Sequence, residues 1–122
     1  MVKYADLLSA NFEYGGRGPK SFDCYGLVQE MYRRKGIETP NFDSPSREEL
    51  QDYFANRLNH WRPTKPGPGV GVALKSMGRL HCGFMLGEVQ FIHASESRKA
   101  VLVERIDSPL WRHNVVGYYD YE

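Results

Sequence analysis

The sequence has almost no excess charge of either sign and no long apolar run. Its 122 residues include 16 Lys and Arg and 15 Asp and Glu, which leaves a formal net charge of +1. Binding to nucleic acid requires a basic excess or a basic stripe, so we expect no nucleic-acid partner. No stretch approaches the roughly 18 apolar residues of a membrane-spanning helix, so we expect no membrane partner either.

The first residues also lack the pattern of a signal peptide. Asp6 interrupts the apolar start of the chain, and the polar residues Ser9 and Asn11 follow soon after. We therefore expect synthesis in the cytoplasm, and any action outside the cytoplasm then needs another export route.

Cysteine is scarce, because Cys24 and Cys82 are the only two. Two cysteines cannot build a disulfide framework, and the zinc patterns CxxC, HxxH and HExxH do not occur. The glycine-rich segment 15–18 lacks the Lys-Ser/Thr of a phosphate-binding loop. We therefore expect no metal and no cofactor. The chain does have 41% hydrophobic and 13% aromatic residues, which suit one packed domain over residues 1–122.

The order of patterns along the chain predicts helices first and strands afterwards. Residues 11–22 are rich in Gly and are expected to form a loop. A helix is expected from the N-cap Asp23 to Gly36, and a second one begins at Ser46. The apolar stripe of this second helix consists of Leu50, Phe54 and Leu58. Strands are expected over residues 70–75, 81–86, 89–93, 101–106 and 115–121. This order is typical of an α+β fold with an antiparallel sheet.

Cys24 is the first candidate for chemistry. It falls in the first turn of the predicted helix, directly after Asp23 and the glycine-rich loop. Free backbone amides and the helix dipole at this position favour the thiolate, which is the reactive form of cysteine. The alternative interpretation is a small buried hydrophobic residue, and a nucleophile also needs a general base.

The four histidines divide into two pairs. His60 and His113 have polar neighbours, and we expect both at the surface. His81 begins one predicted strand and His93 ends the next, so a two-residue turn between the strands brings them to the same end of a hairpin. Together with Cys24 they would supply the nucleophile, the base and the group that orients the base in thiol catalysis. The alternative is a pair of unrelated polar residues on a sheet face.

Cys82 is expected to differ from Cys24. Successive side chains of a strand point to opposite faces, so Cys82 points away from the face that carries His81. It alternates with Phe84 and Leu86, as a core residue does. A disulfide with Cys24 could form in principle but would consume the nucleophile, so we interpret Cys82 as a packing residue.

Three separated motifs add to this interpretation. They are Tyr14-Gly15-Gly16 with Phe22-Asp23-Cys24-Tyr25-Gly26-Leu27-Val28, then His81-Cys82-Gly83-Phe84-Met85-Leu86-Gly87, and finally Phe91-Ile92-His93-Ala94. Their types and order resemble the NlpC/P60 cysteine peptidases. The resemblance implies a papain-like α+β fold, in which N-terminal helices pack on an antiparallel sheet.

The resemblance also implies roles for individual residues. Cys24 matches the family's nucleophile, His81 its base and His93 the polar residue that orients the base. Roles in substrate binding or oxyanion stabilisation fall to Tyr14, Asp23 and Tyr25. The implied reaction is hydrolysis of peptidoglycan stem peptides, commonly between D-γ-glutamate and the following diamino acid.

Some positions depart from the family's pattern. Tyr25 stands where the family has Ser, at a position that lines the cleft, so recognition of the stem-peptide end is expected to differ. Pro68-Gly69-Val70 replaces the usual Gly-Asp before the middle strand. The aromatic residue after Cys24 and the segment 109–119 resemble the phage tail-associated branch, which makes phage tail proteins a further candidate partner. A phage particle would then deliver the enzyme to the cell wall.

Two alternatives to a peptidoglycan hydrolase stay open. One is a structural tail or assembly protein that retains the fold, although a complete triad of Cys24, His81 and His93 favours an enzyme. The other is a thiol amidase or acyltransferase on another substrate, because the same triad serves any amide or thioester.

Overall fold

Eight strands form one curled sheet in the computed structural model, which describes residues 2–57 and 60–121. Their order in the sheet is β2-β1-β7-β6-β5-β4-β8-β3. The strands are β1 (Asn11–Phe12), β2 (Ser21–Phe22), β3 (Arg62–Thr64), β4 (Gly71–Ser76), β5 (Arg79–Met85), β6 (Gln90–Ser95), β7 (Ala100–Arg105) and β8 (Val115–Asp120).

The pairing corrects one expectation from the sequence. The central strands pair antiparallel, as expected, but β1 and β2 pair in parallel, so the sheet is mixed. Both short strands lie within residues 11–22, which we expected to be a loop. Each is only two residues long, and a segment this short carries no readable alternation of apolar and polar residues.

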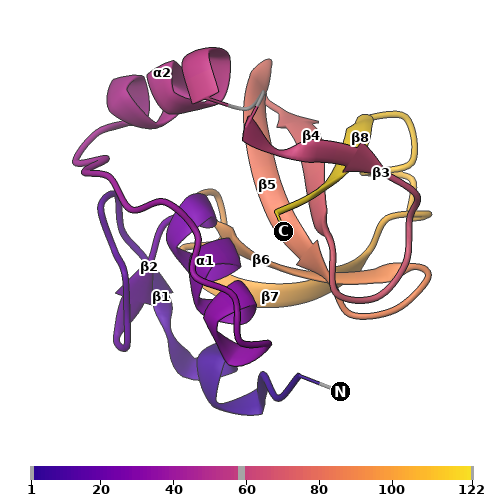
Figure 1. Ribbon diagram of the computed structural model, residues 1–122, viewed down its shortest axis with the longest axis horizontal. Coiled ribbons are helices and arrows are strands. Elements are labelled where there is room, and N and C mark those ends of the chain that lie inside the picture. Colours follow the sequence, from indigo (N-terminus) through magenta and orange to yellow (C-terminus); the bar gives the residue numbers. More distant parts are fainter. Residues whose placement is uncertain (1, 58–59, 122) are drawn as a thin grey trace.

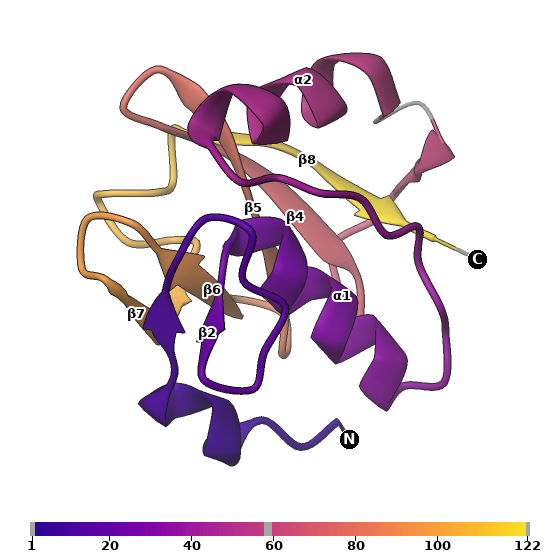
Figure 2. The same ribbon diagram turned by 90° about the vertical axis from the view of Figure 1, so that its left-hand side faces the viewer.

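Among the described residues, two α-helices and the short 3₁₀ helix η1 (Ala5–Ser9) complete the α+β fold. Helix α1 (Cys24–Arg34) lies inside the curl of the sheet and packs on β5 and β6, whereas α2 (Arg47–Arg57) lies beyond one end of β4 and β5 (Figure 1 and Figure 2). Leu50 and Phe54 of α2 are buried, as the expected apolar stripe requires. Leu58, the third member of that stripe, lies outside the described residues.

Both ends of α1 follow from its sequence. Asp23 is the N-cap, and its Oδ1 accepts a hydrogen bond from the backbone N–H of Gly26 at 2.7 Å. At the other end Gly36 adopts a φ of 87°, which reverses the chain, and the N–H of Ile37 donates to the carbonyl of Tyr32. The cap at Asp23 therefore fixes where the helix begins and makes Cys24 its first residue.

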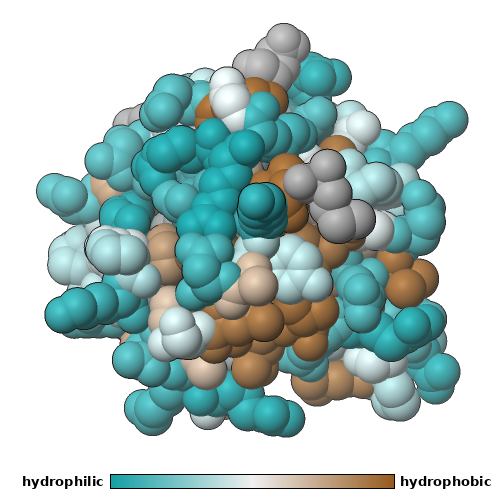
Figure 3. Space-filling model, turned by 90° about the horizontal axis from the view of Figure 1, so that it is seen from below, coloured by the Kyte–Doolittle hydropathy of each residue, from teal (hydrophilic) through white to brown (hydrophobic). Residues whose placement is uncertain are grey.

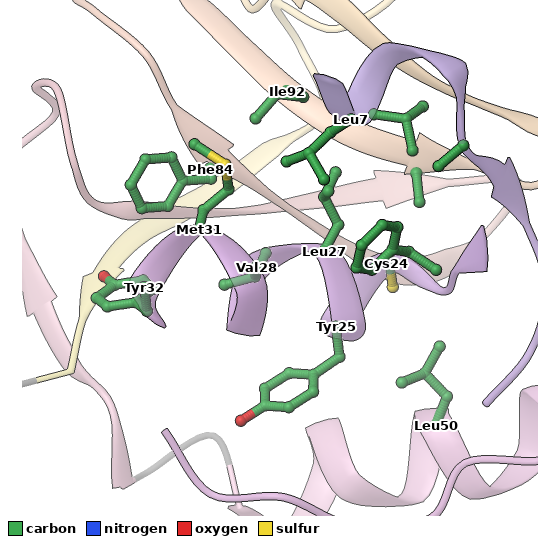
Figure 4. Packing of buried hydrophobic residues seen from close by; sticks show 14 of the residues in the cluster. Leu7, Cys24, Tyr25, Leu27, Val28, Met31, Tyr32, Leu50, Phe84 and Ile92 are labelled. Carbon is green, nitrogen blue, oxygen red and sulfur yellow. The ribbon is translucent and has the colours of Figure 1, made fainter. Parts of the chain in front are cut away.

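The main core lies between α1 and the sheet. Leu27 and Met31 are 0% exposed and point from α1 toward the strands that carry Phe84 and Ile92 (Figure 4). Truncating a buried Leu or Met to Ala costs roughly 2–5 kcal/mol. This packing therefore holds α1, and Cys24 at its start, in a defined position on the sheet.

The lower face of the molecule carries an apolar patch among polar side chains (Figure 3). At the same end, a cavity of about 370 Å³ is lined by Val2, Lys35, Pro68, Gly69, Phe84, Met85 and Leu86. Among the described residues, no helix combines the length and the apolar character that crossing a bilayer requires.

Candidate active site

The candidate site forms where β5 and β6 separate. Over the described residues these strands pair at Phe84–Ile92 and Met85–Phe91, whereas the beginning of β5 pairs with β4 alone. The start of α1 lies beside this opening. A cavity of about 400 Å³ results, and its lining includes Tyr14, Cys24, His81, His93, Glu104 and Trp111.

The register between β5 and β6 places both histidines on the same face. Met85 pairs with Phe91, so Gly83 stands opposite His93, and His81 shares that face because it lies two residues from Gly83. The two-residue turn expected from the sequence would have put His93 opposite Cys82, on the other face. The observed loop closes with the N–H of Leu86 donating to the carbonyl of Gln90, which makes it one residue longer.

Gly83 is needed for this arrangement. A Cβ atom at this position would lie 2.8 Å from the ring of Phe91 and 3.2 Å from the Cβ of His93. A larger residue would push the two strands apart and move His93 away from His81.

Two short hydrogen bonds join the histidines to a carboxylate. His81 Nε2 lies 2.8 Å from His93 Nδ1, and His93 Nε2 lies 2.8 Å from Glu104 Oε2. A carboxylate only accepts, so we assign the proton of neutral His93 to Nε2 and leave its Nδ1 as an acceptor. His81 must then donate from Nε2, and its Nδ1 is free to receive a proton from a thiol.

Glu104 is the site residue that the sequence did not reveal. Its Oε1 accepts a hydrogen bond from the indole N–H of Trp111 at 3.1 Å, so the carboxylate is held from both sides. The hydrogen bond from His93 lowers the pKa of Glu104, and the bond from Trp111 adds to this effect. The sequence signal was weak, since Glu104 is one of two adjacent charged residues in its strand, and its face depends on the pairing of Phe91 with Glu104.

The environment of Cys24 favours its thiolate. Hydrogen bonding with the Cys82 thiol is the largest influence, and together with hydrogen bonding to His81 it lowers the pKa of Cys24 to about 6 despite burial. Burial opposes the charged form at both residues, and at His93 it is the largest influence: it lowers the pKa of the imidazole and keeps the ring neutral. The site thus pairs a readily ionised thiol with a neutral relay histidine.

Cys82 is more than a packing residue, because it influences the pKa of Cys24. It does point away from the face of His81, and it packs against the core cluster that contains Cys24. Burial raises the pKa of Cys82 well above its usual value, and the hydrogen bond with Cys24 raises it further. At neutral pH Cys82 is therefore a protonated thiol beside the candidate nucleophile.

Asp23 serves the framework and does not face the cleft. It is 0% exposed, and Arg17 Nη1 donates to its Oδ1 at 3.0 Å. Its Oδ2 accepts from the Ser44 hydroxyl at 2.6 Å and from the N–H of Gly15 at 3.0 Å. The expectation that Asp23 binds substrate or the oxyanion is corrected, because these donors already occupy both of its oxygens.

Tyr25 is likewise placed in the core rather than along the cleft. It is 2% exposed, and its ring packs against Phe42, Tyr53 and Trp61. Its hydroxyl donates to the carbonyl of Pro40, and burial raises the pKa of the phenol. Figure 4 shows the ring projecting from α1 away from Leu27. The aromatic residue in place of Ser therefore anchors the 40–44 segment and does not enlarge the cleft wall.

Tyr14 does line the cavity, in a polar cluster of its own. Its hydroxyl donates to Glu96 Oε1 at 2.8 Å, and Arg47 Nη2 lies 3.2 Å from Glu96 Oε2. Burial raises the pKa of Tyr14, so the phenol is protonated at neutral pH. The cluster offers a hydroxyl and a guanidinium to a polar ligand at this end of the cavity.

The backbone N–H of Cys24 is a candidate oxyanion donor. As the first residue of α1 it has no partner within the helix, and the structure gives it no acceptor among the described residues. No group of three or more His, Cys, Asp or Glu side chains in residues 2–57 and 60–121 is arranged to hold a metal ion. His60 and His113 are exposed, as expected.

Comparison with known proteins identifies relatives over nearly the whole chain. A model of the NlpC/P60 family matches residues 9–120. The murein DD-endopeptidase MepS/murein LD-carboxypeptidase of Escherichia coli is 31% identical over 113 residues, which are 92% of this chain and 56% of that protein. The probable endopeptidase p60 of Listeria welshimeri is 28% identical over 111 residues, or 91% of this chain and 20% of that protein.

Solved structures share the fold. An NLP/P60-family protein similar to lipoprotein from Staphylococcus aureus superposes with a TM-score of 0.70 at 20% identity, over 93% of this chain and 37% of that one. NlpC2 from Trichomonas vaginalis gives a TM-score of 0.66 at 23% identity, over 94% of this chain and 43% of that one. The chain thus spans about half the length of the Escherichia coli relative and less of the others.

Proposed function

The chain belongs to the NlpC/P60 family, and on this premise we propose that it is a cysteine endopeptidase that hydrolyses peptidoglycan stem peptides. The names of the Escherichia coli and Listeria relatives support a cell-wall peptide as the substrate class. The observation that carries the proposal is the hydrogen-bonded series from Glu104 through His93 to His81, which ends beside the thiol of Cys24.

Cys24 is the proposed nucleophile. Its thiol passes a proton to Nδ1 of His81, and the resulting thiolate attacks the carbonyl carbon of the scissile amide. Because the pKa of Cys24 is lowered to about 6, most of the thiol is ionised at neutral pH. The backbone N–H of Cys24 then donates to the oxyanion of the tetrahedral intermediate.

His81 acts in both halves of the reaction. As the imidazolium it gives its proton to the leaving amine, so that the C–N bond breaks and a thioester with Cys24 remains. It next takes a proton from the attacking water, which hydrolyses the thioester and releases the new carboxylate. The thiol is restored at the end of the cycle.

His93 and Glu104 act through His81 as positioning residues. Glu104 accepts from Nε2 of His93, which leaves His93 Nδ1 to accept from Nε2 of His81. His81 is thereby held in the tautomer whose Nδ1 is unprotonated and can accept the proton of the thiol. The carboxylate charge also stabilises the imidazolium that forms during the reaction.

The scissile bond that we propose is the one between D-γ-glutamate and the following diamino acid. The name of the Escherichia coli relative favours a second candidate, a D,D bond of the peptide cross-link. Both are amides, so one mechanism serves both, and the products distinguish them. Association with a phage tail stays a prediction from the sequence.

The test is digestion of purified muropeptides in a reducing buffer, with product masses determined by mass spectrometry. An uncross-linked stem peptide and a cross-linked dimer serve as parallel substrates. We expect the uncross-linked peptide to be cut after D-γ-glutamate. Cys24→Ala should lower the rate at least about 10³-fold, because it removes the covalent route.

His81→Ala should cause a similar loss, whereas the matched control His60→Ala changes an exposed histidine outside the cavity and should retain the wild-type rate. Identical digests from wild type and Cys24→Ala would refute the peptidase. Cleavage confined to the cross-linked dimer would replace the proposed bond with the D,D bond.

A further inference from the structure

Cys82 is a second thiol that the proposed mechanism does not use. It lies on β5, next in sequence to His81, and points into the interface with α1 where Cys24 begins the helix. Both cysteines are free, and the Cys82 side chain packs against the buried cluster that contains Cys24. The Cys82 thiol is also the largest influence on the pKa of Cys24, which places the two thiols within reach of each other.

Packing alone does not require a cysteine at position 82. Across the β4–β5 pairing its neighbour is Ala73, and an apolar residue at position 82 would fill the same space without a titratable proton. The cysteine places a protonated thiol near Cys24, the thiol whose pKa is lowered. Oxidation follows thiolate character, which is concentrated on Cys24.

We propose that Cys82 is a resolving thiol, which closes a reversible disulfide with Cys24 after a hydroperoxide has oxidised Cys24. The disulfide would store the nucleophile in an inactive but recoverable form. The loss of peptidase activity on oxidation rests on the proposed function, whereas the disulfide itself does not.

The chemistry balances in two steps. The Cys24 thiolate attacks the terminal oxygen of the hydroperoxide, so the O–O bond breaks, an S–O bond forms, and the alkoxide or hydroxide leaving group takes a proton from solvent. Cys24 is now a sulfenic acid, oxidised by two electrons, and the peroxide is reduced. The sulfur of Cys82 then attacks the Cys24 sulfur, the S–O bond breaks, and the hydroxide leaves with the Cys82 proton as water. A dithiol reverses the process by thiol–disulfide exchange.

The different pKa values of the two thiols suit each cysteine to one of these steps. The lowered pKa of Cys24 makes it the thiolate that meets the peroxide first. The raised pKa of Cys82 keeps that thiol unreactive toward peroxide until the sulfenic acid has formed beside it. Closure then also protects Cys24 from further, irreversible oxidation to the sulfinic acid.

The experiment treats the reduced, desalted protein with hydrogen peroxide in small excess, and then alkylates the remaining thiols with N-ethylmaleimide. Peptide mass spectrometry should reveal a peptide pair that joins Cys24 to Cys82, about 2 Da lighter than the sum of the two thiol peptides. Muropeptide cleavage should fall in proportion to the linked fraction. Dithiothreitol should restore both thiols and the activity.

Cys82→Ala supplies the comparison, with each protein measured against its own untreated activity. The same peroxide treatment should inactivate this variant in a way that dithiothreitol does not reverse, with Cys24 recovered as the sulfinic acid. Thermal unfolding of the untreated variant verifies that it is folded. Wild-type Cys24 and Cys82 recovered separately, or a disulfide between two chains, would overturn the proposal.

The two proposals fail in different ways. A linked peptide in a protein that never cleaves muropeptides would refute the peptidase and retain the resolving thiol. Cleavage without any linked peptide would do the reverse.

Discussion

The carboxylates of Asp23 and Glu104 both lie near Cys24 but are bound by different kinds of side chain. Asp23 is 0% exposed and is bound by Arg17, by the hydroxyl of Ser44 and by backbone amides. Glu104 opens onto the cavity and is bound by His93 and by the indole of Trp111. One network joins the glycine-rich loop, the start of α1 and the segment 42–44, and the other joins three neighbouring strands to the thiol.

The difference lies in which partner is able to release a proton. The guanidinium of Arg17 remains charged in proteins, so its pair with Asp23 is a fixed contact that holds the nucleophile's helix in place. The imidazole of His93 has one donor and one acceptor nitrogen, so its contact with Glu104 fixes the direction of the next hydrogen bond. Asp23 therefore determines where Cys24 is, and Glu104 determines how His81 meets it.

The strongest test of this contrast is Asp23→Ala. The substitution leaves the partly buried Arg17 without its counterion and removes the N-cap of α1. Breaking a buried ion pair on one side typically costs about 3–5 kcal/mol, and we expect a loss of unfolding free energy in this range by urea denaturation. The matched control Asp107→Ala removes an exposed pair with Arg105 and should leave the midpoint unchanged. Equal midpoints for the two variants would show that the Asp23 network does not hold the framework.

Glu104→Gln should have the reverse profile, with lost activity and a nearly unchanged unfolding midpoint. The amide retains the shape but removes the charge that supports His93, and losses of about 10–100-fold are typical of such outer-shell partners. Muropeptide kinetics measure the rate. The alkaline limb of the pH–rate profile should also move to lower pH, because the thiolate–imidazolium pair loses a nearby negative charge.

Glu88→Gln is the control for this variant, because Glu88 is an exposed glutamate in the loop between β5 and β6. It should keep both the wild-type rate and the wild-type pH profile. A Glu104→Gln enzyme with a normal profile and a lowered unfolding midpoint would mean that Glu104 is a second framework carboxylate, and the contrast with Asp23 would disappear.

The sequence revealed these two networks to different extents. The N-cap at Asp23 was predictable, because a capping residue, an apolar periodicity and a terminal Gly36 are all local signals. The further partners of Asp23 were not, since Ser44 lies 21 residues away and is brought close by long-range contacts such as the packing of Tyr25 on Phe42.

Glu104 was missed for a related reason. The strand over residues 101–106 was expected, and β7 runs from Ala100 to Arg105, but the face of each side chain depends on register with β6. The faces of the two histidines likewise depend on the register between β5 and β6. The sequence placed both histidines on the correct strands, but they share a face because the loop is one residue longer than the turn that we assumed.

The smallest expected effect is a pH dependence of stability that arises from His93 in the Glu104 network. Burial lowers the pKa of His93 below its ordinary value of 6.5, so the folded protein holds the neutral ring while the unfolded chain takes up a proton first. The stability contributed by neutral His93 is therefore complete above pH 6.5 and is lost as the pH falls through the lower pKa of the folded state. Urea denaturation at several values between about pH 8 and pH 5 should show this decline in a Cys24→Ala background, which removes the thiol that also titrates in this interval. In the same background, His93→Gln should flatten the curve in this interval. An unchanged slope in His93→Gln would place the titrating group elsewhere in the molecule.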